Sequence, residues 1–177
     1  SNITNPDSVW VRVEYNATGC YKVVELDLIV NPLPVLVQPS PLELCDVNNP
    51  GDEMEEFTLE DSVDEILNGQ TGISITFYET QADADAGTNQ VFSPYTNTSV
   101  GGNPHNPQTL YVRAENDVTG CVSTITLDLR VNPIPTPATP DPLEVCDDDN
   151  DGFASFDLEL RTLDIINGEA DISVTYH

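Results

Sequence analysis

An internal repeat constrains the fold of this chain more than any other feature. Residues 1–44 align with residues 102–145 at a constant offset of 101, and 20 of the 44 positions are identical. Beyond Cys45 and Cys146 the offset falls to 99, as in the match of residues 66–69 with residues 165–168. Self-similarity at one fixed period is the signature of a repeat protein. We therefore predict three parts: the C-terminal part of one repeat (1–32), a complete repeat (33–133) and the N-terminal part of the next (134–177).

Proline-rich stretches join the copies. Residues 31–41 read NPLPVLVQPSP, and the equivalent residues 132–142 read NPIPTPATPDP. Such sequences favour the extended polyproline II conformation and behave as semi-rigid spacers. We expect these stretches to act as linkers between repeats.

The repeat has the pattern of an all-β protein. Apolar and polar residues alternate over residues 9–14, 108–115 and 122–131, which predicts a strand and a hairpin partner. Further strands are expected near residues 57–59, 73–78 and 91–95. A capping box formed by Ser62 and Glu65 predicts one short helix, and residues 81–87 predict another. About seven short strands per 100 residues predict tandem immunoglobulin-like Greek-key β-sandwiches.

Four cysteines occupy two equivalent positions. Cys20 and Cys121 lie at the turn of the hairpin, and Cys45 and Cys146 follow the proline-rich stretches. In an immunoglobulin-like sandwich the last hairpin turn and the first strand would share one end, which predicts a Cys45–Cys121 disulfide, with Cys20 and Cys146 paired outside these 177 residues. Pairing of Cys20 with Cys45, and free thiols in a cytosolic protein, are the alternatives. Disulfides indicate an oxidising, extracellular setting.

An acidic loop directly follows Cys45, and another directly follows Cys146. Asp147, Asp149 and Asp151 alternate before Gly152, in the manner of the first half of a calcium loop. We predict a Ca²⁺ site with these three ligands and Asp157 as a late ligand. The counterpart in the complete repeat is degraded and keeps three candidate ligands, namely Asp46, Asn48 and Asp52. A solvated acidic turn without an ion is the alternative.

Composition excludes several classes of function. The formal net charge of −26 leaves nothing to neutralise phosphates, so nucleic-acid binding is excluded. No apolar run reaches the length of a transmembrane helix, so we expect no membrane insertion in this region. His105 and His177 have no nucleophile and carboxylate at a recognisable spacing, so we expect no catalytic residues and no enzymatic activity.

The order of these motifs resembles the tandem repeats of very large cell-surface proteins of Bacteroidetes, including gliding-motility adhesins exported by the type IX secretion system. The matching motifs are residues 146–158 (CDDDNDGFASFDL), 77–84, 110–113 (LYVR), 119–121 (TGC) and 127–135. The resemblance implies an extracellular array of immunoglobulin-like domains, rigidified by calcium, that serves as a stalk or an adhesive.

Two further functions remain open. The repeats could be spacers in a secreted multidomain enzyme, or a carbohydrate-binding module that uses Trp10 and Tyr111, which occupy equivalent outward positions on one strand. The first expectation is a non-enzymatic surface stalk or filament. Its partners would be neighbouring repeats of the same chain, with other surface proteins, glycans or abiotic surfaces as targets.

Overall fold

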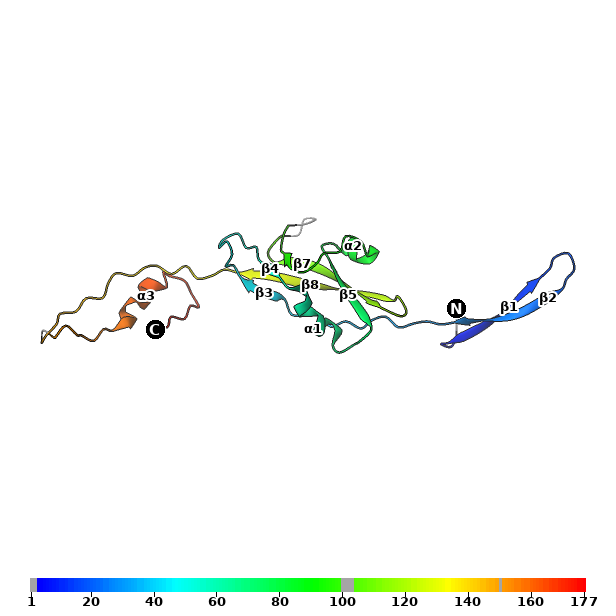
Figure 1. The fold of residues 1–177 in the computed structure, drawn as a ribbon, viewed down its shortest axis with the longest axis horizontal. Coiled ribbons are helices and arrows are strands. Elements are labelled where there is room, and N and C mark those ends of the chain that lie inside the picture. The colour runs from blue at the N-terminus through cyan, green and yellow to red at the C-terminus, as the bar shows by residue number, and fades with distance from the viewer. Residues whose placement is uncertain (1–2, 100–103, 150) are drawn as a thin grey trace.

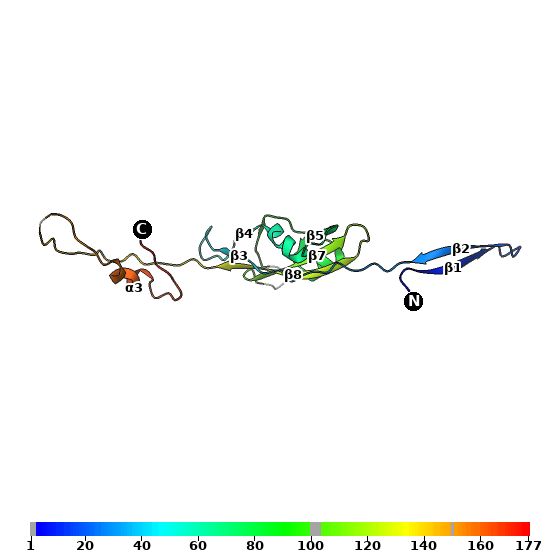
Figure 2. The same ribbon diagram turned by 90° about the horizontal axis from the view of Figure 1, so that it is seen from below.

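The chain forms three parts in a row. A computed structural model describes residues 3–99, 104–149 and 151–177. An N-terminal hairpin, a central unit and a C-terminal segment follow one another along the long axis (Figure 1). The same row is seen after a quarter turn about that axis (Figure 2). Among the described residues no helix has the length and apolar character needed to cross a bilayer.

The N-terminal hairpin and the central unit consist mainly of strands. The hairpin pairs β1 (Asp7–Glu14) with β2 (Tyr21–Leu28). The central unit contains the remaining strands, which are β3 (Leu42–Cys45), β4 (Glu56–Phe57), β5 (Ile73–Tyr78), β6 (Tyr95–Thr96), β7 (Gln108–Asn116) and β8 (Val122–Asn132). The helical elements are short and comprise η1 (Leu59–Ser62), α1 (Val63–Leu67), α2 (Gln81–Ala86), η2 (Leu158–Arg161) and α3 (Thr162–Ile165). The predicted all-β class is confirmed.

Two sheets form the central unit. The larger has the order β3-β8-β7-β5, and the smaller pairs β4 with β6. Strands β7 and β8 form the predicted hairpin, and β5 runs antiparallel to β7. Strand β3 lies parallel to β8, with Leu42 opposite Leu129 and Cys45 opposite Asn132. This parallel pair decides where the cysteines lie.

The core of the central unit follows the alternation of its strands. Leu110 and Val112 of β7 and Leu127 and Leu129 of β8 are fully buried. The cluster is completed by Val131 of β8 and by residues of the smaller sheet, the helical elements and β5, namely Phe57, Leu59, Ile66, Phe77 and Tyr95. Of the equivalent side chains in the β1–β2 hairpin, Val9, Val11 and Leu26 are exposed and Leu28 is half-buried, since the described residues place no other elements over them.

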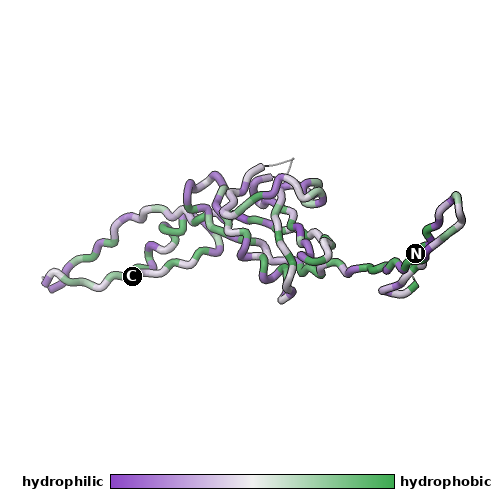
Figure 3. The backbone as a smooth tube through the Cα atoms, turned by 45° about the vertical axis from the view of Figure 1, so that its right-hand side comes forward, coloured by the Kyte–Doolittle hydropathy of each residue, from purple (hydrophilic) through white to green (hydrophobic). Residues whose placement is uncertain are grey.

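The proline-rich stretch between the hairpin and the central unit is not a free spacer. Pro34 and Pro39 are buried, and Leu36 packs against the core. Ser123 Oγ donates to the carbonyl oxygen of Pro34 at 2.7 Å, and Gln38 Nε2 donates to that of Thr126 at 2.9 Å. Figure 3 shows this connection as largely hydrophobic. The expectation of a spacer is therefore wrong for residues 34–41, which extend along β8 and form part of the repeat.

The helix at residue 59 differs from the prediction. Ser62 makes no side-chain cap for α1, and its hydroxyl donates instead to the carbonyl oxygen of Leu59 at 2.8 Å. The chain is already helical at Ser62, since the η1 turn begins at Leu59. A capping box requires an extended residue at that position, so the box does not form.

Equivalent residues make equivalent contacts in successive repeats. The side chain of Asn106 forms two hydrogen bonds with the backbone of Val131, and that of Asn5 forms the same two with Val30. The backbone bond from Val37 to Ile66 recurs from Ala138 to Ile165. The structure thus repeats as the sequence does, which allows contacts seen at one junction to be transferred to the next.

Candidate functional site

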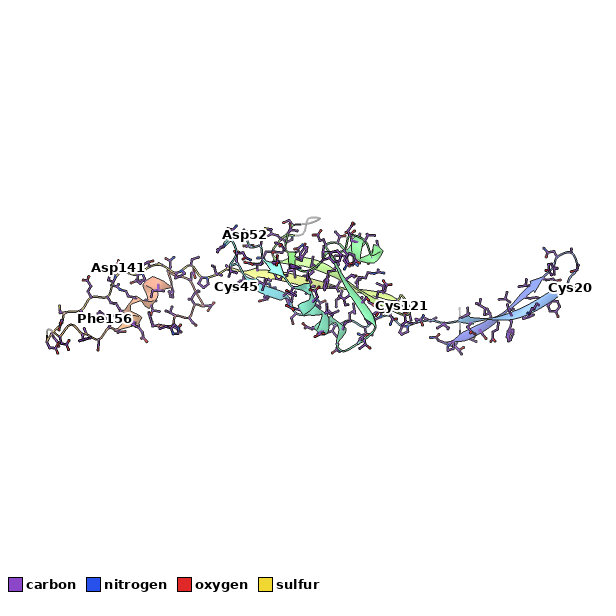
Figure 4. The ribbon with its side chains drawn as sticks, in the orientation of Figure 1. Cys20, Cys45, Asp52, Cys121, Asp141 and Phe156 are labelled. Atoms are coloured by element: carbon purple, nitrogen blue, oxygen red, sulfur yellow. The ribbon has the colours of Figure 1, made fainter. Side chains whose placement is uncertain are left out.

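The cysteines lie at the ends of the repeats. Figure 4 shows Cys45 and Cys121 at opposite ends of the central unit, and Cys20 at the outer turn of the hairpin. Cys45 ends β3 opposite Asn132, the last residue of β8. Cys121 directly precedes β8. All four cysteines are free thiols in the structure.

The predicted Cys45–Cys121 disulfide is wrong for this structure. The length of β8 separates the two cysteines, which is about 35 Å for an 11-residue strand. The α-carbons of a disulfide lie within about 7 Å of each other. The prediction placed the last hairpin turn beside the first strand, whereas the parallel β3–β8 pair places Cys45 at the far end of the last strand. Figure 4 places Cys20 still farther from Cys45, which removes the alternative pairing as well.

The junction between repeats brings Cys121 to a particular residue of the preceding repeat. Its Sγ lies 3.9 Å from the carbonyl oxygen of Asn31. Asn31 is equivalent to Asn132 in the repeat alignment. In the complete repeat, Cys45 lies opposite Asn132. The β3 cysteine of a preceding complete repeat would therefore lie opposite Asn31. By this equivalence, the hairpin-turn cysteine of one repeat and the β3 cysteine of the preceding one would both lie beside the same asparagine.

The acidic loop of the C-terminal segment brings three of its predicted ligands together. One carboxylate oxygen each of Asp147, Asp149 and Asp151 lies within 4.8 Å of the other two, and all three side chains are exposed. Asp147 Oδ2 accepts from the backbone N–H of Gly152 at 2.8 Å, which closes the loop. Two oxygens on opposite sides of a Ca²⁺ ion are about 4.8 Å apart, so the three oxygens could contact one such ion.

Asp157 does not join this cluster. It precedes η2, and its carboxylate accepts from the backbone N–H of Glu159 at 3.2 Å. An aspartate in this position satisfies a free N–H at the start of a helix. In this structure Asp157 therefore caps η2 and lies outside the group of Asp147, Asp149 and Asp151.

The equivalent loop of the complete repeat is closed without an acidic cluster. Asp46 is only 2% exposed, and its Oδ2 accepts from Gly51 at 2.7 Å, as Asp147 accepts from Gly152. Its Oδ1 is buried and has no hydrogen-bond partner among the described residues. Asp52 instead accepts from Met54 and from the amide of Asn49. Within the described parts of the chain, neither Asp46 nor Asp52 belongs to a cluster of three or more acidic, histidine or cysteine ligands.

Glu55 is the residue that sequence reasoning missed. It is 5% exposed, and its Oε1 accepts from the backbone N–H groups of Val47 and Asn48 at 2.6 and 2.8 Å. The Asn48 N–H has the largest effect and lowers the pKa of Glu55, although burial opposes this. The side-chain amide nitrogen of Asn48 also donates to Glu55.

The alignment contains the signal for Glu55. The C-terminal loop has alanine at the equivalent position, Ala154, but carries Asp149 and Asp151 where the complete repeat has Asn48 and Pro50. At these three aligned positions the complete repeat therefore has one buried carboxylate in place of two loop carboxylates, and its Asp52 and Glu53 lie in the two-residue insertion. This exchange explains why only one of the two loops gathers acidic oxygens.

The two aromatic residues considered for carbohydrate binding lie differently. Trp10 is 69% exposed on the hairpin. Tyr111 is half-buried and lies opposite the buried Tyr78 in the β5–β7 pair. In the complete repeat this position packs within the sheet, so it does not present an exposed aromatic platform.

Among the comparisons with known proteins, one family model matches the chain, in three separate segments. A family model described as the Flavobacterium inter-domain disulphide bond domain matches residues 1–34, 41–135 and 142–177. The three matched segments correspond to three successive copies. Comparison with curated proteins and with solved structures yields no match.

Proposed function

The chain belongs to the family of Flavobacterium inter-domain disulphide bond domains, and we propose that its repeats form an extracellular stalk whose neighbours are joined by disulfides in a fixed register. In this register the hairpin-turn cysteine of one repeat bonds to the β3 cysteine of the preceding repeat. The observation that carries the proposal is the contact of Cys121 with Asn31, the equivalent of the residue opposite Cys45.

This register explains why the four cysteines do not bond to one another. Cys121 would pair with the β3 cysteine of the repeat before it, and Cys45 with the hairpin-turn cysteine of the repeat after it. Cys20 and Cys146 occupy the same two positions in the adjacent copies, so their partners lie one repeat farther out. Each partner falls outside these 177 residues.

We further propose that the stalk serves adhesion at the cell surface, as in the gliding-motility adhesins that the repeats resemble. The family supports a Flavobacterium protein with inter-domain disulfides, which suit an oxidising, extracellular setting. The repeat itself is proposed to be immunoglobulin-like, since a sheet of order β3-β8-β7-β5 faces a small β4–β6 sheet across one core. As part of the same proposal, the protein is exported by the type IX secretion system.

Labelling of intact cells tests the proposal. Cells that carry the full-length protein are treated with a membrane-impermeant maleimide, either directly or after an impermeant reductant. We expect labelling of the repeats only after reduction, because the cysteines lie at the surface but would be held in disulfides. Labelling without reduction would show free thiols, and absence of labelling in both cases would place the repeats inside the cell. Either result would contradict the proposal.

Calcium is proposed to bind the loop of Asp147, Asp149 and Asp151. The convergence of three carboxylate oxygens supports this. The repeats would then differ: the 147–151 loop depends on calcium, whereas Glu55 closes the 46–55 loop.

Calorimetric titration with CaCl₂ tests the calcium site in the full-length protein, with the single substitution Asp149→Asn. Losing one of three carboxylate ligands is expected to weaken binding at this loop about tenfold or more. The matched control is Asp148→Asn, which removes an exposed carboxylate outside the cluster and should change the affinity little. Equal affinities for the two variants would contradict the proposed ligands.

A further inference from the structure

Two segments span the complete repeat from one end to the other. Residues 34–45 and residues 121–132 run parallel along the same edge of the sheet, from the junction with the hairpin to Asn132 (Figure 1). Their contacts are continuous: Pro34 with Ser123, Gln38 with Thr126, and Leu42 with Leu129. Arg130 Nη1 and Glu43 Oε1 pair at 2.9 Å near the far end. We call these the two spanning segments.

Both spanning segments are already extended. Residues 122–132 form strand β8, and residues 42–45 form strand β3. The rest of the first segment contains three prolines, Pro34, Pro39 and Pro41, which favour an extended backbone. Roughly 12 residues at about 3.3 Å each give about 40 Å, so neither segment has much length left to release.

The cysteines lie at the ends of the spanning segments. Cys45 ends the first segment, and Cys121 begins the second. The 46–120 stretch, which holds most of the core and the helices, lies between the two cysteines in sequence. A disulfide at either cysteine therefore offers the chain a covalent route that avoids residues 46–120.

We infer that the repeats form an inextensible chain in which tension bypasses the folded core. This inference rests on the proposed disulfide register. Tension that arrives through the peptide at Pro34 would leave through Cys45 into the next repeat. Tension that arrives through Cys121 would leave through the peptide after Asn132. Neither route includes residues 46–120, so unfolding of the core would not lengthen the stalk.

The two routes are redundant in each repeat. Loss of the Cys45 bond leaves the route from Cys121 to Asn132, and loss of the Cys121 bond leaves the route from Pro34 to Cys45. Only a repeat that has lost both bonds must carry tension through its whole length. About 100 residues at about 3.5 Å each would then replace a folded length of about 40 Å, which is a gain of about 300 Å.

Single-molecule stretching of the oxidised full-length protein tests the inference. The variants are Cys45→Ser, Cys121→Ser and the double variant. We expect no unfolding step of about 300 Å at this repeat in the wild type or in either single variant, and one such step in the double variant. Full reduction should produce a step for every repeat. A step of this length in the oxidised wild type or in a single variant would overturn the inference.

A second variant tests whether the stability of the core affects the length of the stretched stalk. Leu110→Ala removes a fully buried side chain of β7 and weakens the core. It should add no step when the disulfides are intact, and it should lower the force of the step in the double cysteine variant. Disulfide mapping of the same sample distinguishes the two levels of failure. If the bonds are present and the steps still occur, the bypass is wrong and the disulfide register stands; if the bonds are absent, both are wrong.

Discussion

Side-chain amides and carboxylates complete the hydrogen bonding of the repeat at single positions. Asn97 is fully buried and accepts from the backbone N–H of Glu55 while donating to the carbonyl oxygens of Glu53 and His105. Gln108 is buried as well and links the hydroxyl of Tyr95 to the backbone of Thr98. Buried polar groups are costly without partners, so these residues hold the loops at the end of the repeat that carries Cys45.

Glu55 makes the stability of the complete repeat depend on pH. Its pKa in the folded state is lower than its ordinary value of 4.5, so the unfolded chain takes up the proton first as the pH falls. The stabilisation by the charged carboxylate is complete above about pH 4.5 and is lost as the pH falls through the lower folded-state pKa. Glu55→Gln should therefore unfold more easily than the wild type at neutral pH, and the difference should shrink in acid.

Thermal unfolding between about pH 7 and about pH 3 measures this difference. The matched control is Glu56→Gln, because Glu56 is the exposed neighbour of Glu55. It should follow the wild type at every pH. A Glu55→Gln variant as stable as the wild type at neutral pH, or a deficit that does not change with pH, would show that the buried carboxylate does not close the loop.

The proline-rich segment before β3 is the element for which the observed role differs most from the predicted one. It joins two repeats, but residues 34–41 pack along β8 as part of the second one. Proline cannot donate a ladder hydrogen bond, so a segment of this kind is confined to the edge of a sheet. The segment therefore fixes the geometry of the junction, and with it the position of Asn31 relative to Cys121.

Leu36→Ala tests whether this segment stabilises the repeat. Leu36 packs against the core, so its truncation should lower the free energy of unfolding by about 1–2 kcal/mol, less than for a fully buried leucine. Leu33→Ala is the matched control, because Leu33 is 61% exposed and its loss should cost less than about 0.5 kcal/mol. Denaturant unfolding gives both values. Equal stability of the two variants would mean that the segment is a free linker.

Alternation predicted the strands that have one buried face. Residues 73–78 were predicted as a strand with the bounds observed for β5, and the buried positions of β7 and β8 are those that alternate. Pairing across long sequence distances was harder to predict. The parallel β3–β8 contact joins residues about 87 positions apart, and local pattern contains no signal for it. For that reason the sequence predicts where each cysteine lies along the repeat, but it does not predict which cysteines lie close to each other.

At the scale of the whole molecule, the repeats follow one another in a row with a cysteine at each end (Figure 4). The net charge of −26 is partly gathered in the exposed 147–151 loop, whereas Asp46 and Glu55 of the preceding repeat are buried. Successive copies therefore share the junction but differ in their loops. The central claim at this scale is the disulfide register between neighbours.

Peptide mapping of the non-reduced full-length protein tests that register directly. A protease that cleaves after acidic residues suits a chain with 31 Asp and Glu and only 5 Lys and Arg. The account predicts that the Cys45 peptide is joined to the hairpin-turn cysteine of the following repeat, and the Cys121 peptide to the β3 cysteine of the preceding one. A Cys45–Cys121 or Cys20–Cys45 peptide, or free thiols at these positions, would contradict it.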